Sequence, residues 1–400
     1  MGRDSAHGQS PRPRRASRGQ GGLTVAPASR LLSGLARLGR PGRILSPELD
    51  ALRTNGLRGG FRARRASATD RDERLATAHL AAYRRIWDDA ATAVGAQLSE
   101  LGGGFLLASR DGVQSVLRHH LVMLNDPATN ALALNKAIVH ELLVDAQIPV
   151  PEYLEAGRGE LPRALSFMQR STGPCVVKPA NGTSGGTGVT CGVQSDDDLW
   201  RAWLRAGRWD RRVLIERQTP GEEYRLLFLE GNLLDAVRRR RPSVVGDGSA
   251  SVTELIELEN QRRLSALDRD VSRLINVDLD CELAVRGEGL SLRSIPARGA
   301  RIAVKNTVSE NAAAENTTAP ELSAELIGQA ARAVELLHLE FAGVDLVTPD
   351  PARSLTDAGG TILEINATPG LHYHYQVADG ERATDVAAPI LERLLSSPRR

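Results

Sequence analysis

One short segment, in which a lysine at the end of an apolar run leads into a loop of glycines, limits the fold more than any other feature. Val176 and Val177 predict a buried strand that ends at Lys178. Residues 179–189 follow, rich in glycine and in hydroxyl and amide side chains. Glycines let backbone N–H groups approach phosphate oxygens closely, and hydroxyl groups add donors. Because the lysine precedes the glycines, the segment is no Walker P-loop and predicts a phosphate-binding loop of another kind. The alternative is a glycine-rich surface loop.

The basic residues of the chain are almost all arginine. Of 51 basic residues only three are lysine, at Lys136, Lys178 and Lys305. An ammonium is a compact point charge that fits between phosphate oxygens, so these three are candidates for positions where arginine would not serve. The charge is also uneven, because residues 1–74 hold 16 arginines and 6 acidic residues. With few apolar anchors, residues 1–70 are expected to form a disordered basic leader.

Composition excludes several classes of protein. A hydrophobic content of 41% and a charged content of 25% are typical of a globular chain. No uncharged apolar run reaches the roughly 18 residues of a membrane helix, so no membrane partner is expected. The basic N-terminus lacks interleaved aromatic residues, which argues against nucleic-acid binding. Widely spaced cysteines predict free thiols and a cytoplasmic location; they are Cys175, Cys191 and Cys281.

Short β-branched runs that alternate with helical periodicities predict a mixed α+β fold. Apolar residues at helical spacing predict a helix over 75–97, and Asp111-Gly112 predicts a hairpin turn after a strand over 105–108. One further helix is expected over 131–146. Later strands are expected over 176–177, 213–215, 225–229, 344–347 and 362–365.

Acidic residues mark the remaining strands. Glu216 ends a strand before a Pro-Gly turn, and Glu223 follows where a carboxylate could accept from ribose hydroxyls; surface acids beside a turn are the alternative. Glu364 and Asn366 are two residues apart on an extended segment, so both point to one face. Asp345 occupies the middle of another apolar strand. Three oxygen ligands on adjacent strands predict a Mg²⁺ site, with solvent-facing polar pairs as the alternative.

In their order and spacing, the glycine loop and the strands that carry Glu216, Glu223, Asp345, Glu364 and Asn366 resemble the ATP-grasp superfamily. The likeness is greatest to the ATP-grasp region of cyanophycin synthetase and of pheganomycin-type peptide ligases. The likeness covers about residues 130–375 and implies an α+β ATP-grasp fold, with the nucleotide held between two subdomains. Together with the composition of the N-terminus, it predicts a leader, a small N-terminal α/β domain, a central subdomain with the glycine loop and a C-terminal subdomain with the Mg²⁺ site, over residues 1–70, 71–128, 129–215 and 216–400. The Mur-ligase-like second site of cyanophycin synthetase has no counterpart here, so iterative polymerisation is not expected.

The resemblance also implies a role for each matching residue. The implied cofactors are ATP and two Mg²⁺ ions, with Mn²⁺ as a substitute, and the metal ligands are Asp345, Glu364 and Asn366. Arg298 is expected to stabilise the acyl phosphate, because a guanidinium binds such oxygens bidentately. Lys305 has no secure match in the family; it is expected to contact the γ-phosphate or the substrate carboxylate, or else to be a solvated loop lysine. The nucleotide ligands are Lys136, Lys178, Ser184, Gly185, Gly186, Gly188, Glu216, Arg217 and Glu223.

The implied activity is that of an ATP-dependent carboxylate–amine ligase, which forms an amide through an acyl phosphate and releases ADP. Its expected partners are a small carboxylate and an amino acid or peptide amine, in specialised or amino-acid-polymer metabolism, and a homodimer or homotetramer is expected. One alternative is a ligase that acylates the N-terminus of a ribosomal peptide, and another is a catalytically silent ATP-binding protein. Substrate contacts are expected from Arg225, from Arg238 and Arg240 on one side of a strand, and from His372.

Overall fold

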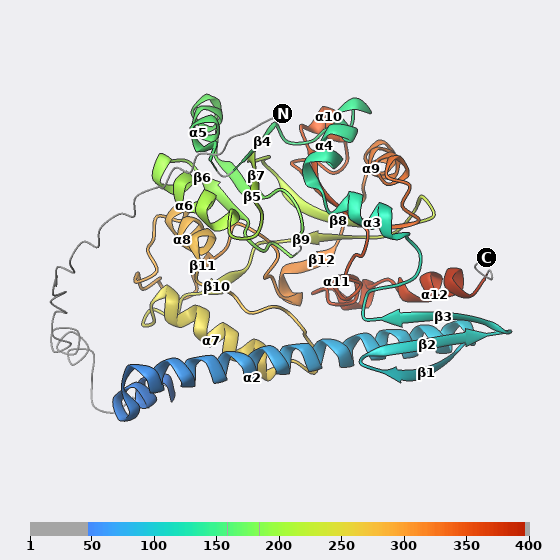
Figure 1. Ribbon diagram of the computed structural model, residues 1–400, viewed down its shortest axis with the longest axis horizontal. Coiled ribbons are helices and arrows are strands. Elements are labelled where there is room, and N and C mark those ends of the chain that lie inside the picture. The colour runs from blue at the N-terminus through green and yellow to red at the C-terminus, as the bar shows by residue number, and fades with distance from the viewer. Residues whose placement is uncertain (1–46, 158, 184, 397–400) are drawn as a thin grey trace, which may run out of the picture. The chain divides into compact units, whose positions relative to one another are not determined.

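The computed structural model describes residues 47–157, 159–183 and 185–396 (Figure 1). The chain divides into two compact units, residues 1–68 and 69–400. Helix α2 (Pro47–Val94) begins in the first unit, so it starts earlier than the helix expected over 75–97. Most of the leader expected over residues 1–70 lies outside the described residues, whereas its last part is helical, because arginine, alanine and leucine are strong helix formers.

A small antiparallel sheet follows α2 in the order β1-β2-β3. Asp111 and Gly112 adopt positive φ between β2 and β3, which confirms the predicted hairpin turn. Tyr83 and Trp87 of α2 belong to one hydrophobic core with residues of β2, β3 and the C-terminal helix α12, which lie together in Figure 1. The bounds are β1 (Gln97–Gly102), β2 (Phe105–Arg110), β3 (Val113–Arg118) and α12 (Ala387–Leu395).

The single helix expected over 131–146 is wrong, because the structure has two helices there, α3 (Pro127–Ala133) and α4 (Lys136–Asp145). Asn135 separates them with an extended backbone, and its side-chain oxygen accepts from the backbone N–H of Ile138 at 3.2 Å. An asparagine N-cap of this kind starts a new helix, and it therefore makes Lys136 the first residue of α4.

A four-stranded antiparallel sheet in the order β4-β7-β5-β6 carries the lysine and the glycine loop. Helices α5 (Leu161–Arg170) and α6 (Asp196–Ala206) pack on it through a core that includes Phe167, Val177 and Trp203. The glycine loop connects β5 to β6. The strands are β4 (Tyr153–Gly157), β5 (Cys175–Pro179), β6 (Thr190–Val193) and β7 (Arg212–Arg217).

A five-stranded antiparallel sheet in the order β12-β9-β8-β13-β14 forms the centre of the second unit. Even-numbered residues of β8, such as Leu226, pack with helix α9 (Ala324–Leu336) and α4. The odd-numbered Leu227 packs on the opposite face, in the core of the β1–β3 sheet. The strands are β8 (Glu222–Leu229), β9 (Asn232–Arg239), β12 (Asn316–Thr318), β13 (Phe341–Thr348) and β14 (Thr361–Asn366).

Between β9 and β12 the chain forms a smaller layer with its own core, which includes Val252 and Val285. Its helix α8 contacts β6, the strand that follows the glycine loop. The α+β class and all five of the later strands expected from the sequence are confirmed. None of the described helices is both long and apolar enough to cross a membrane. The layer contains α7 (Val252–Ser265), α8 (Leu279–Gly287), β10 (Ser243–Val245) and β11 (Arg301–Ala303).

Candidate active site

One face of the five-stranded sheet carries a row of charged side chains. The strand register places Glu223 opposite Arg239, Arg225 opposite Asp345, and Asp345 opposite Glu364. Residues directly opposite each other share a face, so the row runs across four strands from β9 to β14. Further along β8 the same face becomes apolar. The polar row therefore occupies one end of a surface that is otherwise core.

Asp345 is held at the centre of this row by a bidentate ion pair. Arg225 donates from Nε and Nη2 to the two carboxylate oxygens at 2.7 and 2.6 Å, and Asn366 Nδ2 donates to Oδ2 at 3.0 Å. Burial opposes ionisation of Asp345, but the Arg225 guanidinium outweighs it and keeps the pKa of the carboxyl below its usual value. The Tyr373 ring lies 4.9 Å from Arg225 Cζ and 4.5 Å from Arg239 Cζ. Arg225, expected to bind substrate, thus also orients a predicted metal ligand.

Glu223 pairs with an arginine that the sequence did not single out. Arg239 Nη1 lies 3.4 Å from Glu223 Oε1, and Arg239 Nη2 donates to the Val308 carbonyl at 3.3 Å. Burial raises the pKa of Glu223 to about 7, although Arg239 acts in the opposite direction. Glu223 therefore titrates close to neutral pH.

Two of the three lysines lie where the four-stranded and five-stranded sheets meet. Lys178 Nζ is 2.7 Å from Glu216 Oε1 and 3.4 Å from the Leu363 carbonyl of β14. Lys136 Nζ is 3.2 Å from the Thr183 carbonyl, in the glycine loop, and 3.4 Å from Glu364 Oε1. Both lysines are buried, with 5% of Lys136 and 6% of Lys178 exposed. The structure thus places Lys136 of α4 and Lys178 of the four-stranded sheet against β14, the strand that carries two of the predicted metal ligands.

His140 belongs to the same cluster and was missed by the sequence analysis. Its Nδ1 lies 3.6 Å from Glu216 Oε1, and its Nε2 lies 3.4 Å from the Leu363 carbonyl. Burial lowers the pKa of His140 to about 4, so the ring is neutral at pH 7. A small pocket is lined by Lys136, His140 and Glu364. The available signal was the spacing, because residues four apart share one face of a helix.

The glycine loop has a backbone that side chains would not tolerate. Gly185, Gly186 and Gly188 adopt positive φ, where residues with a Cβ are strained. A Cβ on Gly186 would also collide with Ser309 Oγ. Ser184, predicted to bind the nucleotide, lies outside the described residues. The loop geometry fits close approach of backbone N–H groups to a ligand.

The structure places several predicted site residues outside this cluster. Arg238 is partly exposed and pairs with Glu222 at 3.2 Å, and Arg240 is exposed. The side chain that joins the row of charged residues is that of Arg239, between them. Arg217 follows Glu216 on β7 but pairs with Glu152 at 3.4 Å, and 40% of its side chain is exposed. Arg298 is exposed in the loop before β11.

His372 and Lys305 each lie in a surrounding that the sequence did not predict. His372 begins helix α11 (His372–Tyr375), and its Nδ1 lies 3.0 Å from the Tyr83 hydroxyl of α2. Burial lowers the pKa of His372 well below its usual value, so this ring too is neutral at pH 7. It adjoins the charged row through its neighbour Tyr373. Lys305 is 2% exposed and is surrounded by acidic side chains, so it is not a solvated loop lysine.

The predicted metal ligands fit a magnesium–phosphate complex better than a metal site made of protein alone. Across the described parts of the chain, no three His, Cys, Asp or Glu side chains are arranged to hold a metal ion. The predicted set consists of two carboxylates and the Asn366 amide, on neighbouring strands. Mg²⁺ takes hard oxygen donors and is commonly bound by one or two carboxylates together with substrate phosphates. Asp345, Glu364 and Asn366 match that chemistry.

Comparison with known proteins gives matches of modest identity. No protein-family model matches the chain. Over 282 residues it is 31% identical to the cyanophycin synthetase of Crocosphaera subtropica, covering 67% of this chain and 31% of that protein. Over 263 residues it is 28% identical to the glutathione biosynthesis bifunctional protein GshAB of Streptococcus agalactiae, covering 62% and 33%. A solved bifunctional glutathione synthetase from Pasteurella multocida matches with a TM-score of 0.48 at 23% identity, covering 75% and 42%. The chain spans about a third of the length of these two curated relatives.

Proposed function

This chain belongs to the ATP-grasp superfamily, and from that premise we propose that it is an ADP-forming ligase that joins a carboxylate to an amine. One observation carries the proposal: Lys136 and Lys178 meet Glu364 and Glu216 where the two sheets join. The substrates are a small carboxylate and an amino acid or peptide amine. We place the reaction in the cytoplasm, where ATP is available.

The nucleotide is proposed to lie between the two sheets. Each lysine ammonium has three donors. Within the described residues, Lys136 and Lys178 each make two polar contacts, which leaves one donor of each for a phosphate oxygen. The glycine loop is proposed to add backbone N–H donors for oxygens of the β- and γ-phosphates. Glu216 is proposed to meet the adenine end, and Glu223 the ribose hydroxyls.

Asp345, Glu364 and Asn366 are proposed to hold Mg²⁺, or Mn²⁺ in its place, beside the phosphates. A bound divalent ion neutralises phosphate charge and orients the terminal phosphoryl group. The protein's own contribution is to fix its ligands, and Arg225 does this for Asp345 by a two-point contact. Because the ion pair lowers the pKa of Asp345, the side chain is ionised at neutral pH and can act as an oxygen ligand.

The reaction proposed has two steps. A substrate carboxylate oxygen attacks the γ-phosphorus of ATP, and the bond from this phosphorus to the oxygen that bridges it to the β-phosphate breaks. The products of this step are an acyl phosphate and ADP. The amine then attacks the acyl carbon, loses a proton and expels phosphate, which yields the amide. Catalysis of this kind depends on positioning and charge stabilisation more than on covalent chemistry by the protein.

We propose Arg239 and Arg225 as the arginines that face the substrate carboxylate. Arg239 lies on the charged face and stacks on Tyr373, whereas Arg238 pairs with Glu222. His372, beside Tyr373, stays a candidate for the wall of the substrate pocket. Arg298 is exposed and is left out of the proposed site.

The first test measures ADP release with Mg-ATP against a panel of carboxylates and amines, singly and in pairs, with mass spectrometry of the products. We expect ADP formation to require both partners and to yield a mass equal to their amide. A protein that binds no ATP would overturn the proposal. A protein that binds ATP tightly but turns over no pair would contradict the ligase assignment in favour of a silent nucleotide-binding protein.

The second test replaces one buried lysine. Lys178→Met keeps the length of the side chain but removes its charge, and we expect ATP affinity to fall by roughly 100-fold, equal to about 2.7 kcal/mol. Calorimetric titration with ATP measures the change, and thermal unfolding checks the fold, because Glu216 loses its buried partner. The matched control is Arg170→Met, an exposed position at the end of α5. Unchanged affinity in a folded Lys178→Met protein would contradict the assignment of the loop.

A further inference from the structure

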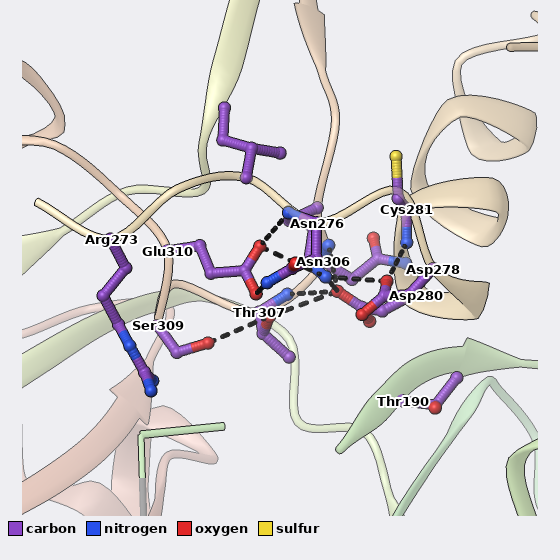
Figure 2. A network of polar contacts seen from close by, with 12 residues as sticks. Thr190, Arg273, Asn276, Asp278, Asp280, Cys281, Asn306, Thr307, Ser309 and Glu310 are labelled. Carbon is purple, nitrogen blue, oxygen red and sulfur yellow. Dashed lines mark hydrogen bonds and ion pairs between the residues drawn. The ribbon is translucent and has the colours of Figure 1, made fainter. Parts of the chain in front are cut away.

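The third lysine is surrounded by acidic groups instead of facing the proposed nucleotide. Lys305 Nζ lies 2.7 Å from Asp278 Oδ1, 3.5 Å from Glu310 Oε2 and 3.9 Å from Asp280 Oδ2. Figure 2 shows the three carboxylates in one polar network, with Asp278 and Asp280 at the start of α8 and Glu310 on another segment. Burial opposes the charge of the ammonium, but the carboxylates outweigh it and raise the pKa of Lys305. One buried cation therefore holds three anions in place.

Asp280 connects this cation to the strand that leaves the glycine loop. Its Oδ1 accepts from the backbone N–H of Cys191 in β6 at 2.9 Å. Its Oδ2 accepts from the backbone N–H groups of Asn306 and Thr307 at 3.0 and 3.1 Å. Asn306 Nδ2 in turn donates to the Cys191 carbonyl at 3.3 Å. Both backbone groups of Cys191 are thus fixed by residues that adjoin Lys305.

Glu310 and a buried arginine tie a second segment into the same network. Glu310 accepts from the backbone and side chain of Asn276, both at 2.8 Å, as Figure 2 shows. Arg263 donates from Nη1 to the carbonyls of Arg273 and Glu310, at 2.5 and 2.6 Å. Residues 273–276 and 306–310 are therefore held together as one support.

This support contacts the tip of the glycine loop directly. Arg273 Nη1 donates to the Gly185 carbonyl at 2.5 Å. Ser309 lies so close to Gly186 that a Cβ there would collide with its hydroxyl. The tip and the exit strand of the loop thus rest on the same network, which is formed by residues far from the loop in sequence. A shift of Lys305 or of the carboxylates around it would therefore move both the tip of the loop and β6.

We propose that Lys305 is a positioning residue that sets the place of the glycine loop through Asp280 and Glu310, and so controls binding of the β- and γ-phosphates without touching the nucleotide. The inference rests on the proposed function, because it takes the loop to bind phosphates. In this proposal, residues 273–276 and 306–310 affect nucleotide binding indirectly, because they hold the glycine loop in place and do not contact the nucleotide themselves. The adenine end is proposed to lie at Glu216 and Lys178, on β7 and β5, strands that lie further from this support than β6 does.

The test compares ligands that do and do not reach the loop. Lys305→Met in the full chain should raise the dissociation constant for ATP by roughly 10-fold, equal to about 1.4 kcal/mol. The dissociation constants for AMP and adenosine should not change, because neither carries the phosphates that meet the loop. Calorimetric titration measures all three ligands. An equal loss of affinity for ATP and adenosine would overturn the inference, since it would indicate general damage to the site.

A second variant keeps the inference testable if Lys305→Met does not fold. Arg273 is exposed, so Arg273→Ala removes the contact with the Gly185 carbonyl without opening the buried network. We expect the same selective loss for ATP, and the matched control is Arg208→Ala, an exposed arginine after α6. If wild-type protein binds ATP and Arg273→Ala binds it equally well, the inference is wrong. If wild-type protein binds no ATP, the proposed function itself fails.

Discussion

The buried imidazole of His140 links the candidate site to the pH dependence of folding. Its pKa of about 4 in the folded protein lies below the ordinary value of 6.5, because burial disfavours the charged ring. Between these two values the unfolded chain binds a proton that the folded chain does not, so the free energy of unfolding falls as the pH falls. The full stability is present above pH 6.5, and His140 alone should cost about 3 kcal/mol by about pH 4.

Denaturant unfolding at several pH values checks this expectation. His140→Gln should lose stability less steeply with acid than the wild type, whereas His338→Asn, a change at an exposed histidine, should follow the wild-type curve. Parallel curves for wild type and His140→Gln would contradict the buried, neutral ring.

At the same scale, the sequence predicted some members of the site and missed others for a physical reason. Lys136 and Lys178 could be found because lysine is so rare here that each remaining one is conspicuous. His140 was missed, since its spacing from Lys136 indicates a shared helix face but does not show what packs over that face. Lys305 was found as unusual but was given a catalytic role, because two of the acidic groups around it, Asp278 and Asp280, lie far from it in sequence.

Strand β9 shows why a correct periodicity can still select the wrong residues. Alternation puts Arg238 and Arg239 on opposite faces at the end of β9, but four consecutive arginines look the same in either phase, so the sequence could not tell which side faces the site. The pairing of Glu223 with Arg239 settles the phase in the structure. The strands with β-branched runs were predictable, whereas the break between α3 and α4 depends on one asparagine cap.

A comparison of neighbouring arginines tests the role of this strand. Arg239→Met should lower kcat/KM by roughly 10- to 100-fold, the effect of losing a hydrogen bond to a charged group. Arg238→Met removes a partly exposed pair with Glu222 and should have little effect. Steady-state rates of ADP release over a range of carboxylate concentrations give the ratio. An equal loss of kcat/KM in both variants would show that catalysis does not depend on which face of β9 an arginine occupies.

At the scale of the whole molecule, every described residue of the candidate site lies in the unit 69–400. Deletion of residues 1–68 should therefore leave ATP turnover unchanged. The shortened chain begins at Thr69, followed by Asp70 and Asp72, and such residues favour the start of a helix. Initial rates of ADP release and the midpoint of thermal unfolding measure the outcome. A lost rate with an unchanged midpoint would assign the first unit a part in substrate handling.

The burial of the lysines has a practical consequence for the chemistry of the protein's surface. All three lysines in the sequence are buried, with 5%, 6% and 2% of Lys136, Lys178 and Lys305 exposed. Reagents that acylate primary amines therefore meet no accessible ε-amine on the folded chain, in spite of its 51 basic residues. An amine-directed dye or surface linker should therefore label these three lysines poorly in the native protein. Any lysine that such a reagent did reach would report an opening of the nucleotide site or of its support.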